Sequence, residues 1–222
     1  MVLESEYGIP ILPLAACAEV IPRPILAWGS FARGRLATVQ AATLHFFVDD
    51  YRFRRLPLPA DLAGWTITEP DFSHDPYSLA SFLGSLYRRR AWAYACAEFG
   101  VRLIADLYCS AAHLRYAFLG LPRGWGAYAW RATRHDDPAT WDARVAAAEA
   151  HAEGRPLRLL VVGGGKRARE WCRRAGERHF VTWLDSAWRR DVVDELEPGA
   201  DVAEPGYGPG WIPPQVLGLE VE

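Results

Sequence analysis

Acidic residues follow several apolar runs of this chain, at the points where the runs end. Asp49 and Asp50 directly follow one run, Asp71 closely follows the next, and Asp106 lies near the end of a third. Carboxylates held close together shift one another's pKa, so that one can act as a general acid and another as a base. The same group could bind a divalent cation. We predict Asp49, Asp50 and Asp71 as catalytic residues, and a metal ion stays an open alternative.

Helix capping is the other role for an acidic residue that follows a strand. An Asp or Ser just before a helix accepts hydrogen bonds from the free N–H groups of the first turn. We interpret Asp75, Asp137 and Asp185 as caps. For Asp49 and Asp71 we favour a site role, because each lies in a charged segment that is longer than a cap requires.

Gly163, Gly164, Gly165 and Lys166 lie between an apolar run and a helical stretch. Backbone N–H groups of such a loop can bind a phosphate at a helix N-terminus. The segment is not a Walker A loop, because the spacing and the Ser or Thr after the lysine are both missing. A tight turn between a strand and a helix is the alternative to the predicted phosphate site.

Arginines near these segments are candidate substrate-binding residues. Arg88, Arg89 and Arg90 lie in the middle of a predicted helix, and a solvated helix face is the simplest interpretation. The alternative is that one of them reaches the strand ends and pairs with an acid or a phosphate. The same two alternatives apply to Arg52. Arg131 follows an apolar run. The predicted substrate-binding residues also include Arg131, Asp106 and Ser73.

The elements that must position these residues repeat as an apolar run, a polar turn and a helical stretch. The runs are rich in β-branched and aromatic residues, which is typical of parallel strands covered on both faces. The predicted strands cover residues 25–28, 44–48, 65–68, 101–107, 126–130, 157–162 and 179–184, with residues 9–14 as a further candidate. The predicted helices cover residues 75–99, 110–119, 137–153, 166–175 and 186–195.

Successive strands from residue 44 onward begin about 21 to 36 residues apart, which is the length of one βα unit. Seven or eight such units predict an α/β protein with a small TIM-like (β/α) barrel, which could be incomplete or irregular. A doubly wound parallel sheet is the alternative, although no GxGxxG follows the first strand. We expect residues 1–196 to form a single domain. Residues 197–222 form a tail rich in Pro and Gly.

Composition narrows the class of protein. The 222 residues are 50% hydrophobic and 23% charged, with a formal net charge of −2. A disordered chain is excluded, and a protein built mainly to coat nucleic acid is disfavoured. The four cysteines lack zinc-site spacing, and the acidic start is unlike a signal peptide. We expect a cytoplasmic protein with reduced thiols and no membrane span.

Five short motifs resemble an uncharacterised bacterial and phage family of the "domain of unknown function" class, which mobile elements also carry. They are YGIP at residues 7–10, HFFVDDYRF at 45–53, PDFS at 70–73, YRRR at 87–90 and GLPRG at 120–124. The resemblance spans residues 7 to 185 and implies no particular reaction. It implies that the family's most recognisable polar positions are Asp49, Asp50, Asp71, Ser73, Arg88 and Arg90.

The chain departs from that family at two strand ends. We associate the family with a Trp-Ser pair after the fourth strand and a Ser-Thr-x-Gly segment after the fifth. Here those positions read Tyr108-Cys109-Ser110 and 130–133 WRAT. The departures suggest a different ligand, or none.

Three functions remain open from the sequence. The first is an enzyme that uses strand-end carboxylates for acid/base or metal-assisted hydrolysis or transfer on a nucleotide or glycosidic substrate. The second is a non-catalytic accessory factor that binds nucleic acid or a protein, which the arginines and aromatic residues favour. The third is a barrel that has lost activity and serves as a scaffold.

Overall fold

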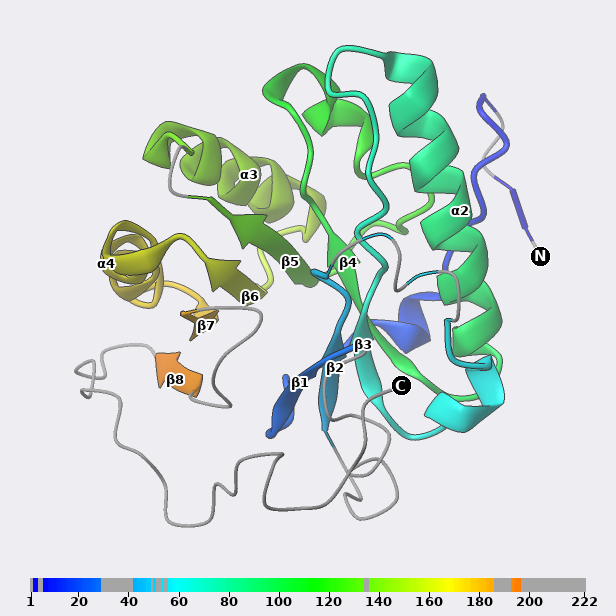
Figure 1. Cartoon of the computed structure of the whole chain (residues 1–222), viewed down its shortest axis with the longest axis horizontal. Helices are drawn as coiled ribbons and strands as arrows, with labels where there is room; N and C mark the ends of the chain where they lie inside the picture. The colour runs from blue at the N-terminus through cyan, green and yellow to red at the C-terminus, as the bar shows by residue number, and fades with distance from the viewer. Residues whose placement is uncertain are drawn as a thin grey trace.

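The computed structural model describes residues 2–3, 6–28, 42–48, 50, 53, 56–133 and 136–185, together with the backbone of residues 193–196. Within these residues the chain alternates strands with helices around one sheet (Figure 1). The predicted tail, residues 197–222, lies outside the described residues. No helix in the described part of the chain combines the length and the apolar character that crossing a membrane requires.

Eight strands form the sheet, and they follow one another in the sheet in the order of the chain. The first seven are parallel, and β8 runs antiparallel to β7. The strands are β1 Ile25–Ala27, β2 Thr43–His45, β3 Thr66–Thr68, β4 Arg102–Asp106, β5 Ala127–Ala132, β6 Arg158–Gly163, β7 Phe180–Leu184 and β8 Val193–Leu196.

The sequential strand order confirms the predicted α/β fold with a barrel-like parallel sheet. A doubly wound sheet reverses its strand order at a switch point, and the order from β1 to β7 has no reversal. The sheet curls as a half-barrel (Figure 1). Among the described strands no pairing joins β8 back to β1, so the barrel is incomplete over this part of the chain.

In the part of the chain that the structure describes, three α-helices pack along the sheet (Figure 1): α2 Leu79–Ala97, α3 Pro138–His151 and α4 Gly165–Ala175. Three short 3-10 helices, η1 Leu14–Ala16, η3 Pro59–Leu62 and η4 Ala111–Tyr116, connect other elements. The caps follow local rules. Ser78 accepts a hydrogen bond from the Ser81 N–H at the start of α2, and Asp137 accepts one from the Ala139 N–H at the start of α3.

Several predictions about local elements were wrong. Residues 110–119 form the 3-10 helix η4 rather than an α-helix, and residues 9–14 form no strand. Residues 193–196 are the antiparallel strand β8, where the sequence suggested the end of a helix. Asp75 does not cap α2, since Ser78 does, and its carboxylate instead accepts a hydrogen bond from the Tyr77 N–H at 2.9 Å. Asp137 is a cap, as predicted.

The two faces of the sheet carry different side chains. Paired residues of parallel strands lie on the same face, and the register places the outer set, such as Ile67, Leu103, Tyr128 and Trp130, against the helices. A smaller apolar cluster on the opposite, inner face includes Ile25, Ile104, Ala127, Ala129, Leu160, Val162 and Leu184. The outer layer therefore supplies most of the core, and the inner face is lined in part by small residues.

Candidate functional site

Polar side chains gather on the inner face at the carboxyl ends of four neighbouring strands. His45 is the last residue of β2, Thr68 of β3 and Asp106 of β4, and Arg131 lies one residue before the end of β5. The strand register places all four on the inner face. The carboxyl ends of barrel strands are where parallel α/β folds place their chemistry, so this edge of the sheet is the candidate site.

Asp71 lies just beyond β3 at this edge, and its side chain is only 9% exposed. No hydrogen bond to its carboxylate is recorded from any described residue. Burial raises the pKa of Asp71 to about 6; the charges of Arg89 and Arg131 oppose the rise, and Asp50 adds to it. A buried carboxyl near neutral pKa can both accept and donate a proton.

Asp50 is an exposed residue close enough to influence Asp71. Its carboxylate accepts a hydrogen bond from the Ser73 N–H, at 3.2 and 3.3 Å to the two oxygens. This contact ties the segment after β2 to the segment after β3. The structure thus brings together two of the three predicted catalytic carboxylates and places the backbone of Ser73 beside them. Asp49 and Arg52 lie outside the described residues.

Asp106 forms a buried ion pair with Arg89 of α2. The Arg89 Nη1 lies 2.6 Å from Asp106 Oδ2, and the Tyr108 N–H donates to Oδ1 at 2.8 Å. Burial raises the pKa of Asp106, and the Arg89 guanidinium lowers it. Both carboxylate oxygens therefore have donors, which holds the end of β4 against α2.

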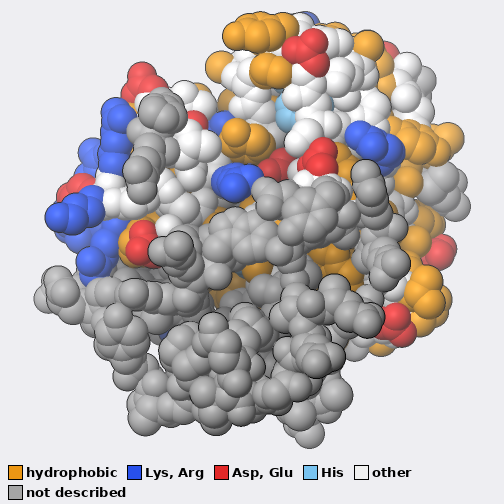
Figure 2. All heavy atoms as spheres, viewed as in Figure 1, with side chains coloured by type: hydrophobic (Ala, Val, Ile, Leu, Met, Phe, Trp, Pro, Cys, Tyr) orange, Lys and Arg blue, Asp and Glu red, His pale blue; other side chains and the backbone are white. Residues whose placement is uncertain are grey.

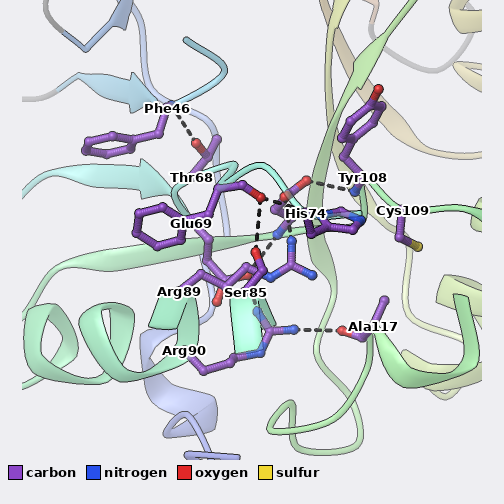
Figure 3. Close-up of polar contacts among 12 residues, drawn as sticks. Phe46, Thr68, Glu69, His74, Ser85, Arg89, Arg90, Tyr108, Cys109 and Ala117 are labelled. Atoms are coloured by element: carbon purple, nitrogen blue, oxygen red, sulfur yellow. Dashed lines mark hydrogen bonds and ion pairs between the residues drawn. The ribbon is translucent and has the colours of Figure 1, made fainter. Parts of the chain in front are cut away.

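A second buried pair, between Glu69 and Arg90, lies close to the first (Figure 3). Glu69 Oε2 accepts from Arg90 Nη1 and from the Asp106 N–H. Arg90 also donates to the carbonyls of Leu119 at 3.1 Å and Ala117 at 2.7 Å. These contacts join β3, β4, α2 and the end of η4, so Arg90 is fully occupied by the protein and completely buried.

The solvated-face interpretation of the three arginines was therefore wrong for Arg89 and Arg90 and right for Arg88. The buried stripe of α2 recurs every three or four residues and includes both buried arginines. Arg88 is exposed, and its guanidinium carbon lies 4.7 Å from the centre of the Phe72 ring. The predicted substrate-binding residues thus separate into Arg88, at the surface, and Arg90, inside the protein.

The glycine run between β6 and α4 is explained by a tight turn. Gly163, Gly164 and Gly165 all have positive φ, which L-residues with a side chain rarely adopt. A Cβ on Gly164 would lie 2.5 Å from the Cβ of Ala168 and 2.8 Å from that of Ala132. Lys166 is exposed. Phosphate binding by this segment stays a prediction, because the turn alone accounts for the glycines.

Some buried polar groups at the site were not singled out from the sequence. They are His45, Glu69 and Arg144, and all three are buried. Arg144 lies on the buried stripe of α3 between Trp141 and Val145, and an arginine at such a position is a signal that sequence patterning offers. Burial, together with the charge of Arg131, lowers the pKa of His45 to about 3, so this imidazole is neutral at pH 7.

No group of three His, Cys, Asp or Glu side chains in the described ranges is arranged to hold a metal ion. The divalent cation stays a prediction. Comparisons of the chain with protein-family models, with curated proteins and with solved structures give no match. The family resemblance suggested by the five motifs likewise stays a prediction.

Proposed function

We propose that the protein is a hydrolase or transferase that works by general acid/base catalysis, with Asp71 as the residue that exchanges the proton. The observation that carries the proposal is a buried carboxyl that accepts no hydrogen bond from a described residue, at the carboxyl edge of a barrel-like sheet. Such a group costs folding free energy, and its retention is typical of sites where the side chain has a chemical task.

The neighbours of Asp71 support distinct roles. Asp50 is exposed and close to Asp71, so it is the second carboxylate, suited to activating water or stabilising positive charge on a substrate. Asp106 is held by Arg89 and the Tyr108 N–H, so it positions Arg89. Arg131 is half-buried on the inner face and is suited to binding the substrate. We propose a glycosidic or nucleotide substrate and a cytoplasmic location.

The test uses a panel of nitrophenyl glycosides and nitrophenyl phosphate mono- and diesters with the full chain. Asp71→Asn should abolish whatever turnover the wild type shows, because the amide cannot exchange the proton. Asp61→Asn is the matched control, since Asp61 is exposed on η3 and should retain full activity. Unchanged turnover in Asp71→Asn, or no turnover by the wild type on any member of the panel, would contradict the proposal.

A second candidate function rests on the outer surface of α4. From residue 166 to residue 178 the chain has six basic and two acidic residues. Figure 2 shows Lys and Arg side chains gathered on the side of the molecule where Figure 1 places α4. A basic face of this kind suits the phosphate backbone of a nucleic acid, as expected for an accessory factor.

This second function predicts binding of labelled DNA that weakens steeply with salt. The double variant Arg167→Gln/Arg174→Gln removes two exposed charges of α4 and should weaken binding and flatten the salt dependence. Arg115→Gln, an exposed residue of η4, is the matched control. Absence of binding at low salt would exclude this candidate.

A further inference from the structure

Buried guanidinium N–H groups of Arg89 and Arg144, near the carboxyl ends of β4 and β5, have no hydrogen-bond partner among the described residues. We propose that the substrate carries an anionic group, a phosphate or a carboxylate, that Arg131 binds directly, with Arg89 and Arg144 supplying the surrounding positive charge. The inference rests on the proposed function, because it assigns a substrate class to the same site. Its test does not depend on turnover, because anion binding is measured directly.

Arg131 is the accessible member of the three. It is half-buried on the inner face of β5, and no hydrogen bond or ion pair joins it to a described residue. Burial is the main cause of the pKa shifts of His45, Asp71 and Tyr108, and the charge of Arg131 lowers all three pKa values. Arg131 therefore lies among groups from β2, β3 and β4, in the middle of the candidate site.

Arg89 has one edge of its guanidinium unused. Nη1 pairs with Asp106, whereas Nε and Nη2 are buried and have no hydrogen-bond partner among the described residues. Nε and Nη2 form the edge that binds a carboxylate or a phosphate through two parallel hydrogen bonds. Buried donors without partners cost folding free energy. An anion that accepted hydrogen bonds from this edge of Arg89 would remove that cost.

Arg144 adds a third buried cation from α3. Its Nη2 donates to the Cys109 carbonyl at 2.9 Å, and its Nε and Nη1 have no partner in the described part of the chain. None of the ion pairs between described residues includes Arg144. A buried charge requires compensation, and a carbonyl dipole supplies little of it.

The described carboxylates near these arginines leave Arg131 and Arg144 without an ion pair to a described residue. Asp106 pairs with Arg89, and the raised pKa of Asp71 leaves part of its population uncharged near neutral pH. Asp136 accepts from the Thr133 hydroxyl at 2.6 Å and the Trp141 indole N–H at 3.2 Å, and it forms no recorded ion pair with a described arginine. An anion bound at Arg131 would supply the ion pair that no described carboxylate gives this arginine.

The experiment measures anion binding to the full chain by calorimetric titration with inorganic phosphate and, separately, with acetate. Sodium chloride at equal ionic strength is the reference, because screening alone affects every exposed charge. The wild type should bind at least one of the two anions above the chloride background. Binding of phosphate alone identifies a phosphorylated substrate, and binding of acetate alone identifies a carboxylate.

Three variants locate the binding. Arg131→Gln should raise the Kd at least tenfold, and Arg131→Lys should retain part of the affinity because it keeps the charge. Arg123→Gln, an exposed residue outside the strand-end cluster, should bind as the wild type does. No binding of either anion by the wild type, or an unchanged Kd in Arg131→Gln, would overturn the inference.

A second measurement requires no variant. Adding phosphate or acetate to the wild type should shift at least one arginine Nε–H resonance in a nitrogen–proton NMR spectrum. If no arginine side chain responds, the inference is wrong even where Arg131→Gln fails to fold.

Asp71→Asn separates this inference from the proposed function. Removing a negative charge beside Arg131 should leave anion binding intact or tighter, although it abolishes turnover. Anion binding without turnover on any substrate would overturn the proposed function alone. Turnover without anion binding would overturn this inference alone.

Discussion

Replacing Asp71 by Asn should stabilise the protein at neutral pH while it abolishes activity. Burial raises the pKa of Asp71 to about 6, against about 4 for an exposed aspartate. The difference of about two pKa units corresponds to about 3 kcal/mol of unfolding free energy. The native state thus loses about this amount when Asp71 ionises, and a neutral isostere avoids the loss.

The sign of the pH dependence follows from proton binding. Between about pH 4 and pH 6 the native protein holds the Asp71 proton and the unfolded chain has released it. Stability from this group is therefore full below about pH 4 and falls as the pH rises to about 6. Asp71→Asn should match the wild type at the acidic end and exceed it by up to about 3 kcal/mol above pH 6.

Urea unfolding followed by tryptophan fluorescence, at several pH values from about 4 to about 8, measures this difference. Asp61→Asn removes an exposed carboxylate of η3 and should show no such pH-dependent gain. If Asp71→Asn is less stable than the wild type at pH 8, or if the difference does not change with pH, then Asp71 is not a buried carboxyl held at a cost. A gain in stability together with lost turnover is the expected signature of a functional group.

Three further perturbations test the packing around the site. Glu69→Gln should cost about 3–5 kcal/mol in urea unfolding because it leaves the buried Arg90 charge uncompensated, whereas Glu170→Gln, which removes an exposed pair, should leave stability unchanged. Gly164→Ala should lower the melting temperature more than Gly165→Ala, because only the Cβ on Gly164 meets neighbouring atoms; equal losses would contradict the turn geometry. A thiol reagent should modify Cys17 first in the native protein, because burial raises the pKa of all four thiols and only Cys17 is partly exposed. The protected thiols are Cys96, Cys109 and Cys172. Earlier labelling of any of these three would refute the prediction.

Much of the fold could be predicted because its signals are local. The seven apolar runs correspond to β1–β7 within a few residues, and the Asp137-Pro138 start of α3 is a cap that sequence reveals directly. Strand spacing of one βα unit then favours a barrel-like order. The wrong predictions lie where local signals are weak: the 110–119 segment forms only 3-10 turns, and β8 gains its conformation by pairing with β7.

The candidate site was only partly predictable. Sequence placed Asp50, Asp71, Asp106 and Arg131 at strand ends, and the parallel register brings the strand ends to one edge. It did not predict that Arg89 would pair with Asp106, because that contact depends on how α2 packs on β4. The sequence favoured a solvated face for Arg89 and Arg90, because burial of an arginine is favourable only with a partner, and that partner lies elsewhere in the chain.

The sequence by itself determined the alternation of strands and helices, the parallel sheet and the edge at which acids and arginines collect, since these depend on the period of apolar residues and on residues at element ends. Tertiary structure alone decided which carboxylate is paired and which is not. Asp106 gained Arg89 and the Tyr108 N–H, whereas Asp71 is buried and accepts no hydrogen bond from a described residue. That difference arises because desolvation and ion pairing depend on distances between elements, and those distances are fixed only when α2 packs against the sheet.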